Sequence, residues 1–312
     1  MTARSKGKVG VVGLGTMGGA YARHLAAAGW SVTGFDIAVP RKRAAARAGV
    51  AIASDARALA VATPTIVMSL PSAEALDMTV AAITREKLPP RTVVETSTLK
   101  LADKQRAERT LRRAGHVMLD CPVSGTGAQA AVKDIVVYAS GDTQAIARSR
   151  RVFADFSRAA YDAGAFGNGS RMKYVANLLV TIHNVASAEA IVLGMKSGLD
   201  PQLVYDLISA GVGKSRIFEL RGPMMVRNEY DDVTMSVKLY HKDISVIEDH
   251  ASTLGVPTPL FSASIPVYSS AMALGYGQQD TASVCAVLQT MAGIKRGKTK
   301  RRGKKRSGRG GR

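Results

Sequence analysis

Short apolar, β-branched runs alternate with amphipathic, alanine-rich segments along the first half of the chain. Runs of the first kind favour strands, and apolar positions that recur every three to four residues favour helices. We therefore expect strands at residues 8–12, 31–35, 65–69, 92–96, 117–120 and 135–139, and helices at residues 17–28, 41–48, 54–60, 73–83 and 99–114. This alternation predicts an α/β fold with a doubly wound parallel sheet.

The pattern changes after about residue 167, where strand signals fade and long helical patterns follow. Helices are expected at residues 170–197, 201–210, 215–221, 236–254 and 259–274. Asp200 followed by Pro201 is typical of a helix start, whereas Gly198 and Gly211 indicate helix ends. We predict an α/β domain over residues 1–166, an all-α domain over 167–294 and a tail over 295–312.

The tail changes how the charge of the chain is interpreted. The chain of 312 residues has a formal net charge of +19, and residues 295–312 hold eleven lysines and arginines and no acid, which leaves +8 for the rest. A segment without hydrophobic residues cannot offset its ordering entropy, so we expect it to be disordered. It is either a solvated tail or a contact for nucleic acid or an anionic membrane.

Composition otherwise indicates an ordinary globular protein, with 46% hydrophobic and 21% charged residues. The two cysteines, Cys121 and Cys285, do not suggest a disulfide framework and fit a reducing compartment. No apolar run reaches the roughly 20 residues that a membrane-spanning helix needs. The histidines show no metal-ligand spacing, so no metal is predicted. We expect a soluble cytoplasmic protein that does not engage a membrane.

A glycine-rich loop follows the first predicted strand and opens the first predicted helix. It reads Gly13-Leu14-Gly15-Thr16-Met17-Gly18, which is a GxGxxG pattern. The first glycine permits a tight turn, the second lets the backbone approach a pyrophosphate, and the third lets the helix pack on the strand. The helix N-terminus supplies amide donors for the anion. The loop therefore predicts a dinucleotide site.

An aspartate at the end of the second predicted strand bears on the choice of dinucleotide. Asp36 follows Gly15 by 21 residues, and a carboxylate there accepts hydrogen bonds from the ribose hydroxyls and repels a 2′-phosphate. This favours NAD. Arg41, Lys42 and Arg43 come shortly afterwards and could pair with a 2′-phosphate, so NADP stays open.

Lys173 and Asn177 lie four residues apart in the predicted helix after Gly167, so they share a face. Lys173 is either a solvated surface lysine or a general acid/base. A lysine at its usual pKa of about 10.4 is a poor base at neutral pH. Partial burial and the positive end of its helix would both lower that pKa. Asn177 could orient the lysine or hold a substrate hydroxyl.

Several loops at strand ends carry polar groups at the edge where open α/β sheets bind ligands. Ser124, Gly125 and Thr126 offer hydroxyls and backbone amides that could cradle a carboxylate, or they form an ordinary turn. The segments 69–71 and 95–98 are ordinary strand exits by themselves. Lys242 could approach a cofactor or a carboxylate, although a mixed-charge helix is more often a solvated face.

Four motifs taken in order resemble the β-hydroxyacid dehydrogenase family, which includes 3-hydroxyisobutyrate dehydrogenase and tartronate semialdehyde reductase. They are VGLGTMG, DCPVSG, GNGSRMKYVAN and HKDISVIED, and the resemblance spans residues 8–292. It implies an N-terminal Rossmann domain, a helical C-terminal domain for substrate binding and dimerisation, and an active site in the cleft. It also implies NAD(P)-dependent interconversion of a small 3-hydroxy acid and its semialdehyde or keto form, in a homodimer or homotetramer.

The resemblance also implies roles for single residues. Lys173 becomes the catalytic acid/base, Asn177 helps to position the substrate, and Ser124 and Gly125, with Thr126 beside them, bind its carboxylate. Cofactor contacts are implied for Leu70, Pro71, Thr98 and Lys242. The chain departs from the family at Thr126, where a second glycine is common, and at residues 129–133, which replace a usual GAxxG segment.

Two rival functions stay open. An imine-reducing or 6-phosphogluconate-type relative is disfavoured by Lys173 and by the lack of an evident basic pocket. The second rival is a dehydrogenase-like binding module that the basic tail recruits to nucleic acid.

Overall fold

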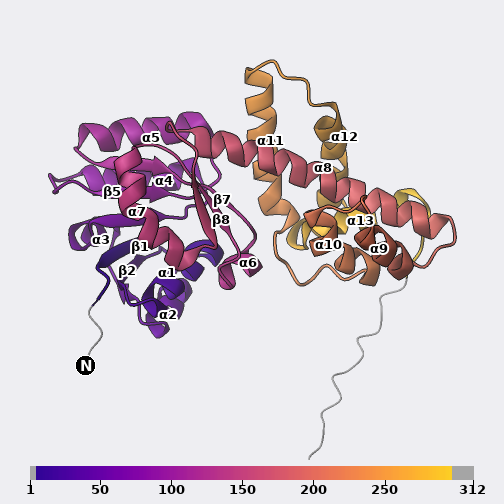
Figure 1. Ribbon diagram of the computed structural model, residues 1–312, viewed down its shortest axis with the longest axis horizontal. Coiled ribbons are helices and arrows are strands. Elements are labelled where there is room, and N and C mark those ends of the chain that lie inside the picture. The colour runs from indigo at the N-terminus through magenta and orange to yellow at the C-terminus, as the bar shows by residue number, and fades with distance from the viewer. Residues whose placement is uncertain (1–4, 297–312) are drawn as a thin grey trace, which may run out of the picture. The chain divides into compact units, whose positions relative to one another are not determined.

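The computed structural model describes residues 5–296, so the predictions for most of the basic tail lie outside the described residues. The chain divides into two compact units. The first runs to Leu178 and includes Lys242–Pro257, and the second contains Leu179–His241 and the residues after Pro257. All strands labelled in Figure 1 belong to the first unit.

A six-stranded parallel sheet forms the centre of the first unit, which confirms the predicted α/β fold. Its strand order is β3-β2-β1-β4-β5-β6, so the strand order reverses between β1 and β4. The strands are β1 (Lys8–Val12), β2 (Ser31–Phe35), β3 (Ala51–Ile52), β4 (Thr65–Met68), β5 (Thr92–Glu95) and β6 (Val117–Asp120). The carboxyl ends of β1 and β4 therefore define the place where such sheets bind ligands.

Helices cover both faces of this sheet because its strands bury side chains on both sides. Along β4, Val67 packs with the core on one face, and Ile66 and Met68 pack with the core on the other. Figure 1 shows α1 (Thr16–Ala27) and α2 (Val39–Arg47) on one side, and α4 (Ala73–Thr84) and α5 (Leu101–Arg113) on the other, with α3 (Ala56–Ala62). The burial of alternate apolar residues on two faces is typical of parallel sheets.

The strand expected at residues 135–139 does not join the parallel sheet. It is β8 (Val136–Ala139) in a separate three-stranded sheet, between β7 (Val123–Ser124) and β9 (Ala159–Asp162). Strand β7 pairs antiparallel with β8, because the chain returns through the short helix α6 (Gly127–Ala131) rather than a long crossover. The further helix α7 (Thr143–Phe156) packs with the core on the α1 face.

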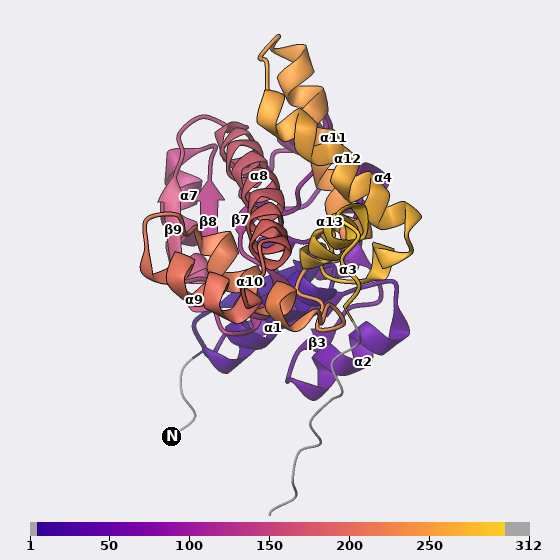
Figure 2. The same cartoon turned by 90° about the vertical axis from the view of Figure 1, so that its right-hand side faces the viewer.

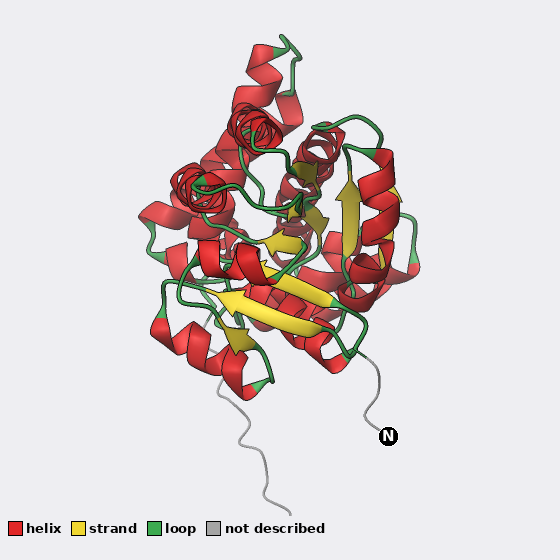
Figure 3. Ribbon diagram, turned by 90° about the vertical axis from the view of Figure 1, so that its left-hand side faces the viewer, coloured by secondary structure: helices red, strands yellow, loops and turns green. Residues whose placement is uncertain are grey.

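The described part of the second unit is helical. Figure 3 shows the strands of the protein in yellow among its red helices. The helices of the second unit include α9 (Pro201–Ala210), α10 (Arg216–Arg227), α12 (Pro259–Ala273) and α13 (Val284–Met291), with the short turns η1 (Tyr276–Gln278) and η2 (Thr281–Ser283). Helices α9 and α10 lie side by side (Figure 2). Helix α11 (Val237–Thr253) contributes residues to both units.

Helix α10 continues past the predicted end at residue 221 and includes Pro223. Proline removes the donor that would bond the Glu219 carbonyl four residues earlier. The Tyr205 hydroxyl donates to that carbonyl at 3.3 Å and takes the place of the missing donor. Gly222 makes room for the ring, because a Cβ there would lie 2.6 Å from it. The contact with Tyr205, which is distant in sequence, thus permits Pro223 within the helix, although a proline in the local sequence predicts a helix end.

Helix α8 (Asn168–Lys196) is the longest element and carries Lys173 and Asn177 in its first turns. By length and composition it could cross a membrane, since one 18-residue window has a mean hydropathy of 1.6. This corrects the expectation that no apolar segment is long enough. The core helices of soluble proteins share the property, and 44% of this window is buried within the protein.

Candidate functional site

The glycine loop between β1 and α1 can only be built with glycines at two of its positions. Gly13 has φ +85°, and a Cβ there would lie 2.1 Å from the Ser69 carbonyl oxygen. A Cβ on Gly18 would lie 1.9 Å from the Gly13 carbonyl oxygen, so helix α1 packs directly on the turn. These contacts confirm the predicted strand–turn–helix geometry.

The N-terminus of α1 is open toward the space above the loop. Gly15 is the N-cap and supplies no side-chain hydrogen bond, and the first turn contains no acidic residue. The first-turn amides are therefore available to an anion, to which the helix dipole adds attraction. A Cβ on Gly15 would meet only Arg41, at 3.7 Å, so this position is kept clear of other side chains. The loop fits the diphosphate of a dinucleotide.

Asp36 lies beside this loop and is 5% exposed. Its carboxylate accepts hydrogen bonds from the amides of Leu14 at 2.8 Å and Ala38 at 2.7 Å. One guanidinium nitrogen of Arg41 lies 3.5 Å away. The acid is thus fixed at the edge of the glycine loop. Its Oδ2 accepts from both Leu14 and Arg41, whereas Oδ1 accepts the Ala38 amide and keeps a lone pair for a ribose hydroxyl. Arg41 lies at the same edge, where its guanidinium could pair with the 2′-phosphate of NADP, so the site is compatible with both NAD and NADP.

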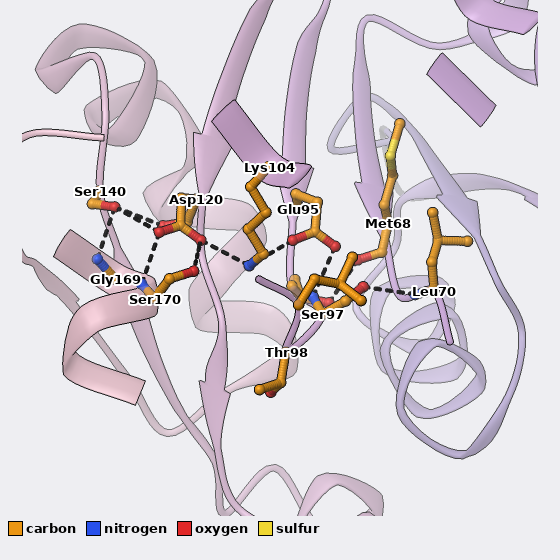
Figure 4. Close-up of polar contacts among 12 residues, drawn as sticks. Met68, Leu70, Glu95, Ser97, Thr98, Lys104, Asp120, Ser140, Gly169 and Ser170 are labelled. Atoms are coloured by element: carbon orange, nitrogen blue, oxygen red, sulfur yellow. Dashed lines mark hydrogen bonds and ion pairs between the residues drawn. The ribbon is translucent and has the colours of Figure 1, made fainter. Parts of the chain in front are cut away.

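The neighbouring strand exits meet through side-chain hydrogen bonds (Figure 4). The Ser97 hydroxyl accepts the amide of Leu70 at 2.8 Å, which joins the exit of β4 to that of β5. Lys242 donates to the Thr98 carbonyl oxygen. Leu70, Pro71, Thr98 and Lys242 were expected to contact the cofactor. The structure brings Leu70 and Thr98 onto two bonded loops and places Lys242 against the second.

The loop after β6 holds Ser124, Gly125 and Thr126. Gly125 has φ +140°, and a Cβ there would lie 2.6 Å from the Ile135 side chain, so glycine is required. Thr126 caps α6, and the Thr126 amide donates to the carboxamide oxygen of Gln129 at 3.0 Å. The residues that depart from the family pattern therefore form a capping box.

This loop also touches the glycine loop. A Cβ on Gly127 would lie 2.3 Å from the Thr16 side chain. The two predicted sites, for substrate and for dinucleotide, are consequently neighbours in the first unit.

Lys173 is buried, with 8% of its surface exposed, so the alternative of a solvated surface lysine is wrong. Burial lowers the pKa of its ammonium, Asp243 partly opposes this effect, and Lys242 adds to it. The shift favours the neutral amine, which is the form that accepts a proton. A lysine with a lowered pKa beside a predicted cofactor loop has the properties of a general base.

Asp243 belongs to the HKDISVIED motif, which gave it no role of its own, but the structure places it at the centre of this cluster. The Asn177 amide donates to its carboxylate at 3.1 Å, and the Lys242 ammonium lies 3.3 Å away. Burial raises the pKa of Asp243, whereas Lys242, Lys173 and the hydrogen bond from Asn177 lower it. The signal for this residue was present in the HKD motif, because Asp243 follows Lys242 directly.

Comparisons with known proteins agree with this arrangement. A family model described as the NAD binding domain of 6-phosphogluconate dehydrogenase matches residues 8–166. A second, described as NAD-binding of NADP-dependent 3-hydroxyisobutyrate dehydrogenase, matches residues 167–288. An L-threonate dehydrogenase of Cupriavidus necator is 31% identical over 284 residues, which are 90% of this chain and 95% of that protein.

Two solved structures are similar along most of the chain. The 3-hydroxyisobutyrate dehydrogenase of Salmonella typhimurium has a TM-score of 0.81 and 30% identity, and the match covers 90% of this chain and 99% of that one. The 3-hydroxyisobutyrate dehydrogenase of Mycobacterium tuberculosis, in a structure with L-serine, has a TM-score of 0.83 and 26% identity, with the same coverage. None of these comparisons supports a nucleic-acid-binding module.

Proposed function

Because the chain belongs to the β-hydroxyacid dehydrogenase family and is an NAD(P)-dependent oxidoreductase of small hydroxy acids, we propose the following roles for its site residues and the following substrate. Lys173 is the general acid/base. In oxidation its neutral amine takes the proton of the substrate hydroxyl, and in reduction its ammonium returns that proton. NAD(P), when bound, accepts or supplies the hydride. The burial of Lys173, together with the lowered pKa that this burial causes, is the observation that carries this proposal.

The other residues hold the reactants in place. Asn177 fixes Asp243 and offers its carboxamide to the substrate hydroxyl, while Ser124 and Gly125, with Thr126 beside them, bind the substrate carboxylate. The glycine loop from Gly13 to Gly18 binds the diphosphate, and Asp36 binds the ribose. Leu70, Pro71, Thr98 and Lys242 border the nicotinamide end. Orientation of this kind supplies a large part of the rate of a two-reactant step.

We propose a small polyhydroxylated acid as the substrate, with L-threonate as the first compound to test. L-threonate dehydrogenases are 30–32% identical to the chain, whereas the mycobacterial 3-hydroxyisobutyrate dehydrogenases are 27% identical. We further propose that the functional boundary lies between residues 166 and 167, where the two family models meet, and that the enzyme works in the cytoplasm.

A substrate panel with a matched variant tests the reaction. L-Threonate, 3-hydroxyisobutyrate and related acids are incubated with NAD or NADP, and nicotinamide absorbance is followed. Lys173→Ala should lower kcat by about 10²-fold or more, because the proton acceptor is lost, while NAD still binds. Lys87→Ala removes an exposed lysine of the same unit and should leave kcat unchanged. Near-normal turnover by Lys173→Ala would exclude the assigned role.

A further inference from the structure

A fully buried ion cluster lies between the proposed cofactor loops and helix α8 (Figure 4). The Lys104 ammonium on α5 lies 2.7 Å from Glu95 Oε2 and 2.8 Å from Asp120 Oδ1. All three side chains are 0% exposed. Burial by itself would lower the pKa of Lys104, but Asp120 and Glu95 outweigh burial and raise it, so Lys104 stays charged. None of the three groups belongs to the proposed chemistry.

On one side the cluster holds the first turn of α8. Asp120 accepts the Ser170 amide at 2.7 Å and the Ser170 hydroxyl at 2.8 Å. Its neighbour Ser140 accepts the Gly169 amide at 2.9 Å. The Asp120 carboxylate therefore caps α8 from a distant strand and complements the positive end of the helix dipole. Lys173 lies three residues after Ser170, in the turn that this carboxylate fixes.

On the other side the cluster holds the loops at the ends of β4 and β5. Glu95 Oε1 accepts the Ser97 amide at 2.9 Å. The Ser97 hydroxyl in turn accepts the Leu70 amide at 2.8 Å. These two loops are the ones assigned above to the nicotinamide end of the cofactor. The Lys104 ammonium bridges the carboxylates of the two sides.

A merely stabilising role does not explain the use of charge at this position. A buried ion group is often no more stabilising than well-packed apolar side chains of similar volume, although removing one member is costly. What charged partners add is a fixed geometry, because each carboxylate oxygen faces either a hydrogen-bond donor or the Lys104 ammonium. A second contact runs beside the cluster, since the Tyr174 hydroxyl donates to the Leu99 carbonyl oxygen at 2.6 Å. Loss of the cluster should therefore loosen the connection without abolishing it.

We propose, on the basis of the proposed function, that Lys104 is a positioning residue that couples the cofactor loops to the turn carrying Lys173. Binding of the dinucleotide orders the loops at residues 70–71 and 97–98. Glu95, Lys104 and Asp120 transmit this order to the first turn of α8. The amine of Lys173 is thereby held in place when the cofactor is present.

Hydrogen exchange followed by mass spectrometry tests the coupling without any substrate. The full-length protein and the double variant Glu95→Gln/Lys104→Met are compared with and without NAD. The double variant removes one charge of each sign, and Asp120 keeps its bonds to Ser170. NAD should slow exchange in a peptide covering residues 168–176 of the wild type. In the double variant it should slow exchange at residues 68–72 and 96–99 only. Equal protection of residues 168–176 in both proteins, or none in the wild type, would overturn the proposal.

Kinetics provide a second readout on the substrate found by the panel. The double variant should lose about 10-fold or more in kcat, because a small misplacement of a reacting group is costly, with KM for NAD within about two-fold of wild type. The pH profile of oxidation should also move to higher pH, since a less enclosed Lys173 regains a higher pKa. Leu111→Ala is the matched control, because Leu111 is buried on the same helix outside the cluster.

The outcomes separate this inference from the proposed function. Equal losses of kcat in the double variant and in Leu111→Ala, at equal loss of thermal stability, would refute a positioning role. Wild-type protein that shows NAD-dependent protection of residues 168–176 but oxidises no hydroxy acid would refute the proposed reaction and leave the coupling standing.

Discussion

At the scale of single residues, the cluster around Lys173 makes the proton transfer depend on a neighbouring carboxylate. Asp243 attracts the protonated form of Lys173 and so keeps its pKa from falling further. Asn177 holds Asp243 by a hydrogen bond. The proposed base Lys173, its electrostatic partner Asp243 and the residue Asn177 that orients this partner thus come from two helices that are far apart in sequence.

Removing the charge of Asp243 should move the pH dependence of turnover in a defined direction. Asp243→Asn keeps the size of the side chain and an oxygen for Asn177, but loses the attraction for the Lys173 ammonium. The pKa of Lys173 then falls further, and oxidation, which needs the neutral amine, should reach its plateau at a lower pH. The measurement is the pH profile of kcat for oxidation. Glu248→Gln, an exposed change on the same helix, serves as the control, and a shift to higher pH would contradict the assignment.

Asp36 should set the preference between the two dinucleotides. Asp36→Ala removes the ribose acceptor and the charge that repels a 2′-phosphate, while Arg41 remains beside the site. Affinity for NAD should fall by about 10-fold, an amount expected for lost hydrogen bonds to a charged group, and affinity for NADP should fall less or rise. Titration of cofactor fluorescence measures both. An equal loss for NAD and NADP would remove the basis for a preference for NAD.

At the scale of elements, the glycine loop separates two requirements that a GxGxxG pattern combines. Gly18 is needed by the protein itself, because a Cβ there would collide with the Gly13 carbonyl. Gly15 is not, because a Cβ there would make only an ordinary contact with Arg41. Because Gly15 has no side chain, the diphosphate can approach the backbone at this position.

The two corresponding alanine variants should therefore differ. Gly18→Ala should lower the free energy of unfolding by about 1–3 kcal/mol through overpacking and should also weaken NAD binding. Gly15→Ala should change the free energy of unfolding by no more than about 0.5 kcal/mol, yet weaken NAD binding strongly. Denaturant unfolding and cofactor titration give the two quantities. Wild-type affinity for NAD in Gly15→Ala would show that the diphosphate lies elsewhere.

The elements also show where local sequence was sufficient and where it was not. The strands β1, β2 and β6 begin and end where their apolar patterns predicted. In β1 and β6 consecutive residues are buried on both faces, which leaves a clear apolar run. The two-residue strand β3 and the largely exposed strand β9 carry no such pattern and were missed. Helices α7 and α13 were also missed, although the spacing of Ile146, Phe153 and Phe156 in α7 is helical.

Residues 135–139 were predicted to be a strand, but their sheet was not predicted correctly. The length and direction of the connections decide which sheet a strand joins. The identity of the pairing strand is not encoded in the sequence of the strand itself. The candidate site likewise contains residues that local sequence could predict and residues that it could not. Spacing alone pointed to the glycine loop and to Lys173 with Asn177, and the roles of Leu70, Pro71, Thr98 and Lys242 were implied by the family resemblance. The cluster of Glu95, Lys104 and Asp120 depends instead on side chains from three elements that meet only in the fold.

At the scale of the whole molecule, we propose a homodimer or homotetramer. Helix α9 presents Leu203 and Leu207, which are 47% and 65% exposed and lie four residues apart on one face. Leu193 at the end of α8 is 69% exposed. Apolar surface of this kind on a helical unit supports association, and we assign its partner to a second copy of the chain.

Acidic side chains introduced on this face of α9 should dissociate the oligomer. Leu203→Glu/Leu207→Glu introduces like charges into a self-associating surface, so the molar mass by light scattering should fall toward that of one chain of 32.9 kDa. Ile37→Glu, at a residue that is 87% exposed in the first unit, is the control and should leave the mass unchanged. A wild type that is itself monomeric would rule out the assembly.

The buried cluster of Glu95, Lys104 and Asp120 also has a consequence for how the sequence can diverge. A change of Lys104 alone leaves two carboxylates buried without their counter-ion, whereas a change of Glu95 alone still leaves Lys104 paired with Asp120. A paired change removes both charges together and is tolerated far better. The effects of substitutions at the two positions should therefore be strongly non-additive. Positions 95 and 104 are expected to change together during evolution, and a change of Lys104 that precedes a change of Glu95 is expected to be a barrier.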